Sequence, residues 1–143
     1  MNERERERFD ALLEEAIAEL PDGVRRLLDE VPVVVEDAPS RDLAESLLRE
    51  WGEPTTSEEI DRLRDELCGL HTGLGLPERS VEDAPAVPED IMLFRIGIIA
   101  AANGWDQPDA DDAVYEEIAI TLLHEIGHHF GLKEDDLERL GYA

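Results

Sequence analysis

The sequence HEIGHHFG at residues 124–131 carries a chemical pattern that works only on a helix. Residues four apart lie one turn apart on the same helix face, so the imidazoles of His124 and His128 can reach one metal ion. Glu125 lies beside this pair, where a carboxylate can hold a water molecule. The apolar residues that recur through the segment from about 112 predict a helix, and Gly131 is suited to its C-terminal cap. The chain must therefore present a long helix near its C-terminus.

Two histidines and a glutamate in the HExxH spacing are the ligands and the base of a zinc hydrolase. The competing interpretation is a helix with incidental surface histidines beside an acidic cap. The amphipathic character of the segment favours the metal. So does Gly127, which we expect on the face turned from solvent, where it allows close packing behind the metal. Gly131 favours it too, because the chain can turn back toward the metal directly after His128.

The third metal ligand is bounded by the length of chain that follows the motif. Catalytic zinc usually takes three protein ligands and one water. Only fifteen positions follow His128, so a distant downstream helix cannot supply the ligand. Glu134 is the first choice, because it lies ten residues after His124 and three after Gly131, and Asp135 is the second. The full set of candidates is Glu134, Asp135, Asp136, Glu138 and, from upstream, His71.

The two other histidines receive different predictions. His129 lies five positions after His124, so its side chain points away from the pair. We expect it at the surface or supporting the ligands, and not as a ligand itself. His71 lies between glycines, in a segment that suits the edge of a sheet. It is either an exposed loop or edge residue, or a hydrogen-bond donor in the substrate site.

Composition excludes several classes of function. The chain has 13 basic and 37 acidic residues, with a net charge of −24, so no basic stripe exists to bind a nucleic acid. Cys68 is the single cysteine, which excludes an intramolecular disulfide and a multi-cysteine zinc site. The charged N-terminus lacks the apolar segment of a secretory signal, and the longest apolar run, residues 96–102, is too short to span a bilayer. We therefore expect a cytoplasmic protein with no membrane partner.

The remaining sequence predicts a single domain over residues 1–143 in which helices and short strands alternate. Residues 31–37, VPVVVED, predict a strand, and their continuous run of β-branched residues predicts that it is buried on both faces. Residues 68–73, CGLHTG, suit a short edge strand. Residues 91–96 predict another strand, in which Arg95 pairs with a carboxylate, and the following GIIAAA either extends it or begins a short helix. The first predicted helix has its apolar positions at residues 9–20 and a solvated start in the ERERER run at 3–8. The others cover residues 24–28, 41–51, 57–67, 112–130 and 134–140, with Ser40 and Thr56 as N-terminal caps of the third and fourth helices.

The stretch at residues 114–142 resembles the small bacterial zincin-like metallopeptidases of the HExxHxxGxx(E/D) type. Three further stretches fit the same family, VPVVVED, GLHTGLGLPERS and DIMLFR, so the resemblance covers most of the chain. It implies an α+β fold, with a small mixed sheet packed against the active-site helix beside additional N-terminal helices. It also implies zinc on His124 and His128, with Glu125 as the general base. An edge strand would bind the substrate backbone, near His71 or residues 91–95.

We therefore expect a zinc metallopeptidase that hydrolyses peptides or unfolded proteins, with Glu125 as its catalytic residue and a metal site formed by His124, His128 and Glu134. The alternative is a metal-binding or protein-interaction module without catalysis. The two differ at the metal, because an open coordination position beside Glu125 favours the enzyme, whereas four protein ligands favour a structural site.

Overall fold

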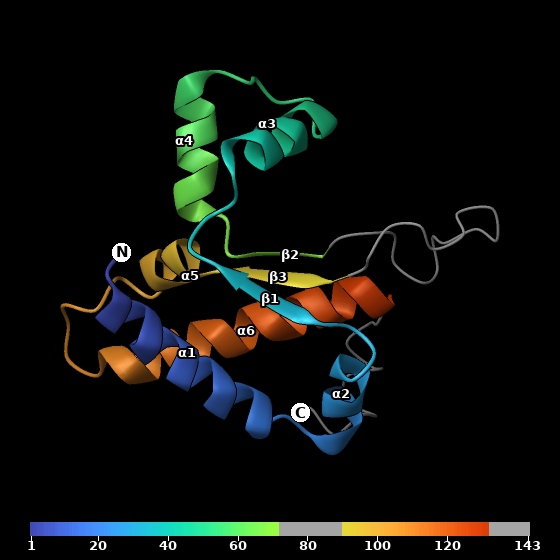
Figure 1. Cartoon of the computed structure of the whole chain (residues 1–143), viewed down its shortest axis with the longest axis vertical. Helices are drawn as coiled ribbons and strands as arrows, with labels where there is room; N and C mark the ends of the chain where they lie inside the picture. Colours follow the sequence, from blue (N-terminus) through green and yellow to red (C-terminus); the bar gives the residue numbers. More distant parts are fainter. Residues whose placement is uncertain (72–89, 132–143) are drawn as a thin grey trace.

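The computed structural model describes residues 1–71 and 90–131, which form six helices and a three-stranded sheet. The longest helix, α6 (Ala110–Phe130), runs along the sheet and contacts α1 (Glu3–Ala18) (Figure 1). This arrangement confirms the predicted α+β fold with a small mixed sheet beside the motif-bearing helix. The helix predicted at residues 134–140 lies outside the described residues. Within the described part of the chain, no helix is both long and apolar enough to cross a membrane.

Three of the six described helices begin at a residue whose side chain caps the helix. The side chains of Ser40 and Thr56 accept hydrogen bonds from backbone N–H groups three residues on, which confirms both predicted caps. They open α3 (Arg41–Glu50) and α4 (Ser57–Glu66). Asn2 caps α1 in the same way, and α2 (Asp22–Leu28) begins directly after a proline. These short-range contacts explain why the starts of α3 and α4 could be predicted from sequence.

The sheet has the strand order β1–β3–β2. Its strands are β1 (Val33–Glu36), β2 (Gly69–His71) and β3 (Ile91–Phe94), and β3 pairs parallel with β1 and antiparallel with β2. The prediction that the first strand is buried on both faces is wrong. β1 lies at an edge and its valines are only half-buried, whereas the central strand β3 carries three fully buried residues, Ile91, Leu93 and Phe94.

The strand predicted to reach residue 96 ends at Phe94, and α5 (Arg95–Ala101) follows at once. This decides between the two alternatives for GIIAAA in favour of a helix. Gly97 brings α5 against the connection between α4 and β2. A Cβ atom at Gly97 would lie 2.1 Å from the carbonyl oxygen of Leu67, so only glycine allows this approach.

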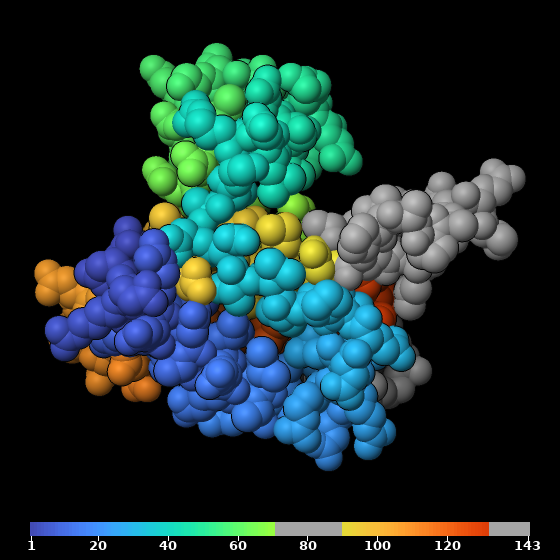
Figure 2. Space-filling model, viewed as in Figure 1, coloured from blue at the N-terminus to red at the C-terminus, as the bar shows by residue number. Residues whose placement is uncertain are grey.

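Two apolar clusters hold the molecule together. The main core lies between the sheet, α1, α2 and α6, and is almost wholly aliphatic apart from Phe9. A smaller cluster joins α3 to α4 through Ala44, Leu48 and Ile60. These two helices stand off from the main body as a separate lobe (Figure 2). The long helix α6 thus belongs to the larger and better packed part of the structure.

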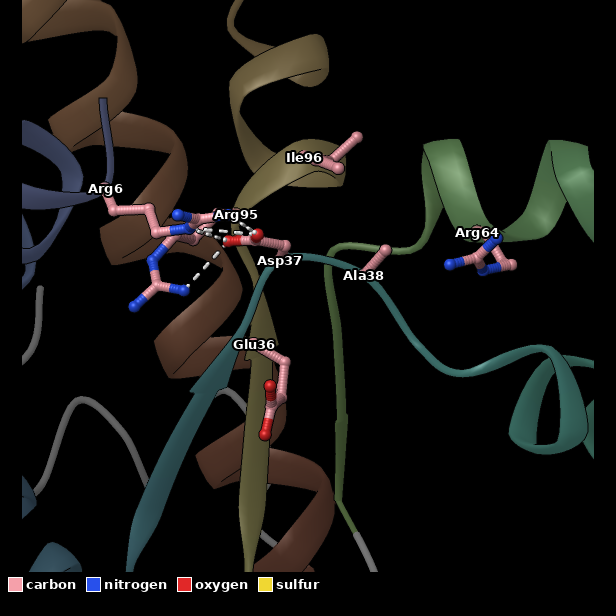
Figure 3. Close-up of a pocket in the computed structure, with 7 residues that line it drawn as sticks. All are labelled: Arg6, Glu36, Asp37, Ala38, Arg64, Arg95 and Ile96. Atoms are coloured by element: carbon pink, nitrogen blue, oxygen red, sulfur yellow. Dashed lines mark hydrogen bonds and ion pairs between the residues drawn. The ribbon is translucent and has the colours of Figure 1, made fainter. Parts of the chain in front are cut away.

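An ion-pair network joins α1, the end of β1 and the start of α5 (Figure 3). The carboxylate of Asp37 accepts hydrogen bonds from Arg6, with Nη2 at 2.7 Å, and from Arg95, with Nη1 at 3.0 Å. Arg95 also donates two 3.0 Å hydrogen bonds to Asp10. The predicted pairing of Arg95 is therefore confirmed, although Arg95 begins a helix rather than lying in a strand. The network lines a surface hollow of about 450 Å³, with Arg64 of α4 on its other side.

We expect Asp37→Asn to destabilise the protein by about 1–3 kcal/mol at pH 7, because two arginines lose a charged acceptor. Hydrogen bonds from Arg6, and then from Arg95, hold the pKa of Asp37 below its usual value of 3.8 although partial burial raises it. The carboxylate therefore stabilises the fold above pH 3.8, and this contribution is lost as the pH falls through the lowered folded-state pKa. Urea unfolding at a series of pH values should show the difference between variant and wild type shrinking below that point.

A suitable control for Asp37→Asn is Asp61→Asn. Asp61 forms an ion pair with Arg41, but both side chains are well exposed, so the loss should stay below about 1 kcal/mol. Equal losses for the two variants, or a difference from wild type that does not change at low pH, would contradict the role given to Asp37.

Candidate metal centre

Helix α6 presents most of its apolar residues to the core and one narrow stripe to solvent. It begins after Asp109 and ends at Gly131, whose φ of 64° lies in the left-handed region that glycine adopts without strain. The exposed stripe runs along the helix at a spacing of four residues and comprises Glu116, Ile120, His124 and His128. The buried residues between these positions anchor the helix, so the stripe has a fixed place beside the sheet.

His124 and His128 lie side by side on this stripe. Their ring centroids are 4.2 Å apart and the ring planes are inclined by 42°. Because zinc–nitrogen bonds are about 2.0–2.1 Å long, two imidazoles this close can bind one ion. The structure therefore confirms the shared face that the i, i+4 spacing predicts, and it provides a fitting pair of nitrogen donors. Their role as metal ligands stays a prediction.

Glu125 is buried beside the histidine pair, with 7% of its surface exposed. The strand β2 covers it closely, because a Cβ atom at Gly69 would lie 3.0 Å from Cγ of Glu125 and 2.9 Å from Cγ2 of Thr121. Glycine at this position thus lets the sheet edge approach α6 one residue from His124. Glu125 is thus a buried residue that lies next to two histidines and under a sheet edge.

The described residues supply part of a metal site. Within residues 1–71 and 90–131, no group of three or more His, Cys, Asp or Glu side chains is gathered in a way that could hold a metal ion. The candidates for the third ligand that follow the motif, Glu134, Asp135, Asp136 and Glu138, all lie outside these ranges. His71 is the last residue of β2 and pairs with Ile91 through the backbone register. The described residues therefore fit two of the three protein positions of a catalytic zinc site.

His129 is buried, although one of the two alternatives expected from sequence placed it at the surface. Only 1% of its surface is exposed, and its ring packs edge-on against Phe130 at 4.9 Å. The prediction of a surface position is wrong. His129 follows His124 by five residues, so it lies on a different face of the helix, which is turned toward the interior. It nevertheless points away from the pair, as its spacing predicts.

Cys68 lies just before Gly69 and is the chain's single cysteine. Burial raises the pKa of this thiol, and the negative charges of Glu117 and Glu125 raise it further. The thiol therefore stays protonated at neutral pH, and a thiolate is the form of cysteine that attacks carbonyl groups. This environment does not suit Cys68 to be a nucleophile beside the histidines.

Sequence reasoning did not identify two residues that the structure places at this centre. Gly69 belongs to the predicted edge strand, but its approach to Thr121 and Glu125 depends on tertiary packing that local sequence does not encode. Ile120 lies one turn before His124 on the exposed stripe. Its position could have been predicted from sequence. Ile120 precedes the motif by four residues, so it lies on the face of the histidines, where an apolar residue does not contribute to the core.

Comparison with known protein families gives a match. The family model described as zincin-like metallopeptidase matches residues 28–142, which is most of the chain and includes all three strands and α6. No curated protein matches the chain.

Proposed function

Because the chain belongs to the zincin-like metallopeptidase family, we propose that it is a zinc-dependent peptidase in which His124 and His128 bind the metal and Glu125 is the general base. The observation that carries this proposal is the 4.2 Å spacing of the two imidazoles on an exposed helix face. The buried carboxylate between that face and the sheet edge supports it. Family membership supports the class of reaction, and the chemistry of the side chains supports the role that we propose for each residue.

The proposed reaction is the addition of water to a peptide carbonyl followed by cleavage of the C–N bond. A zinc ion held by His124 and His128 would supply Lewis-acid chemistry, since a bound zinc lowers the pKa of water toward about 7. Glu125 would accept the proton of the water that attacks the peptide carbonyl and would pass it to the nitrogen of the leaving amine. Proton transfer by a positioned side chain is worth about two to four orders of magnitude in rate.

The substrate we propose is an extended peptide or an unfolded protein. In the described part of the sheet β2 pairs on one side only, with β3, so its other edge can accept a peptide strand. The contact of Gly69 with α6 would hold such a peptide close to Glu125. His71, at the end of the same strand, would then hydrogen-bond the substrate.

We propose Glu134 as the third zinc ligand, with Asp135 as the second choice. Support comes from the end of α6, where Gly131 takes a left-handed conformation three residues after His128. A helix that ends this way turns the chain sharply, which suits a ligand that follows closely in sequence.

We expect the purified protein to hold one zinc ion per chain, and His124→Ala or His128→Ala to lose most of it. Each variant lacks one of three protein ligands, so its affinity for zinc should be lower by at least an order of magnitude. Metal analysis and a competition assay with a coloured chelator measure this. Cleavage of labelled, unfolded casein should stop with a chelator and return with added zinc.

Glu116→Gln is the matched control, because Glu116 lies on the same exposed stripe two turns before His124. It should keep both zinc and activity. Full zinc binding in His124→Ala would contradict the proposed ligands. Zinc bound normally without any cleavage of unfolded protein would favour the alternative of a non-catalytic metal-binding module.

A further inference from the structure

Helix α6 exposes one large apolar side chain. Ile120 is 51% exposed, although Ile118 and Leu122 on either side of it are fully buried. Only two other large apolar residues of the described chain are comparably exposed, Met1 at the terminus and Trp51 at the end of α3. An exposed isoleucine leaves apolar surface in contact with water, which is unfavourable, whereas a polar residue at this position would be well solvated. A ligand that covers Ile120 would recover this energy.

The position of Ile120 relates it directly to the proposed metal pair. It lies four residues before His124 on the same stripe, which corresponds to about 6 Å along the helix axis. The next residue, Thr121, and Glu125 are the two residues that meet Gly69 of β2. Ile120 therefore lies beside the point where the sheet edge and α6 come together, one turn from the imidazoles.

We propose that Ile120 is a specificity-determining residue that contacts an apolar substrate side chain within about two residues of the cleaved bond. This inference rests on the proposed peptidase function. Side chains on one face of an extended peptide recur about every 6.5–7 Å, close to the spacing from His124 to Ile120. A peptide paired with β2, with its reacting carbonyl at the histidines, thus places one side chain over Ile120. The enzyme prefers an apolar residue at that substrate position.

The test compares the cleavage sites that wild type and Ile120→Lys produce in unfolded casein, read by mass spectrometry of the peptides. Wild type is expected to favour an apolar residue at one position beside the cut. Ile120→Lys should lower that preference about 10-fold, the scale of a change in one apolar contact, and should raise cleavage next to Asp and Glu at the same position. Ile120→Val should keep the wild-type pattern. An unchanged pattern in Ile120→Lys overturns the inference.

Trp51→Lys is the matched control, because it removes a comparably exposed apolar residue in the α3–α4 lobe. It should leave the cleavage pattern unaltered. A change equal to that of Ile120→Lys would mean that surface charge alone alters specificity, and would overturn the proposed contact.

A binding measurement separates this inference from the proposed function. In the Glu125→Gln background, fluorescence anisotropy with two labelled hexapeptides, identical except for Leu or Glu at one central position, reports binding without cleavage. Tighter binding of the Leu peptide, reversed by Ile120→Lys, supports the contact even if the wild type hydrolyses nothing. If the two peptides bind equally well, both with Ile120 in place and in the Ile120→Lys variant, the contact is overturned whether or not the wild type is a peptidase.

Discussion

Glu125→Gln is expected to leave the zinc content unchanged and to lower peptide hydrolysis by about two to four orders of magnitude. Glutamine has nearly the shape of glutamate, so the buried packing against Thr121 and Gly69 should persist. Its amide cannot accept a proton from water, so the step assigned to Glu125 fails while metal binding by the histidines is retained. Metal analysis beside a casein-cleavage assay on the same preparation measures both quantities.

The control for this substitution is Glu117→Gln, which makes the same chemical change two turns earlier on α6, away from the histidine pair. It should retain near wild-type hydrolysis. Glu125→Gln with full activity would remove Glu125 from the mechanism, and loss of zinc together with activity would give it a structural role instead.

Gly97→Ala is expected to lower the free energy of unfolding by about 3 kcal/mol or more, the upper range for overpacking a core. The added methyl group would lie 2.1 Å from the Leu67 carbonyl oxygen and 2.6 Å from its carbon, so α5 must move away from the α4–β2 connection. Backbone cannot rotate out of the way as a flexible side chain can. The roughly 1 kcal/mol that alanine gains over glycine inside a helix is too small to compensate. Urea unfolding followed by circular dichroism measures the loss.

Gly52→Ala is the control, because it introduces backbone strain without the steric crowding that Gly97→Ala introduces. Gly52 has a φ of 72°, but nothing lies within 4 Å of a Cβ atom placed there, so its substitution should cost only about 1–2 kcal/mol. If Gly97→Ala costs no more than Gly52→Ala, the close approach of α5 to Leu67 is not important for stability.

Local signals explain which parts of the fold could be predicted. The caps at Ser40 and Thr56 depend on contacts within three residues, and the shared face of His124 and His128 depends on helix geometry alone. The family resemblance suggested by the motif is confirmed over residues 28–142. Each of the caps, and the histidine pair, is determined by a few neighbouring residues.

The features that sequence reasoning misjudged depend on distant parts of the chain. A run of valines looks the same in an edge strand and in a central strand, so the edge position of β1 was not readable from residues 31–37. The burial of His129 depends on what packs against the second face of α6. The approach of Gly69 to Glu125 joins residues far apart in sequence. The third zinc ligand stays a prediction because its leading candidates, Glu134 and Asp135, lie outside the described residues.

The order of the strands has a consequence for how the chain acquires its structure during synthesis. The central strand β3 is the last of the three in sequence, and β1 and β2 pair with it rather than with each other. Neither outer strand has its described partner until residues 91–94 leave the ribosome. The sheet therefore forms late, and Gly69 can be held against Glu125 only after α6 has also been made. In a growing chain of this topology, Gly69, His124 and Glu125 therefore come together only after residues 91–128 have been made.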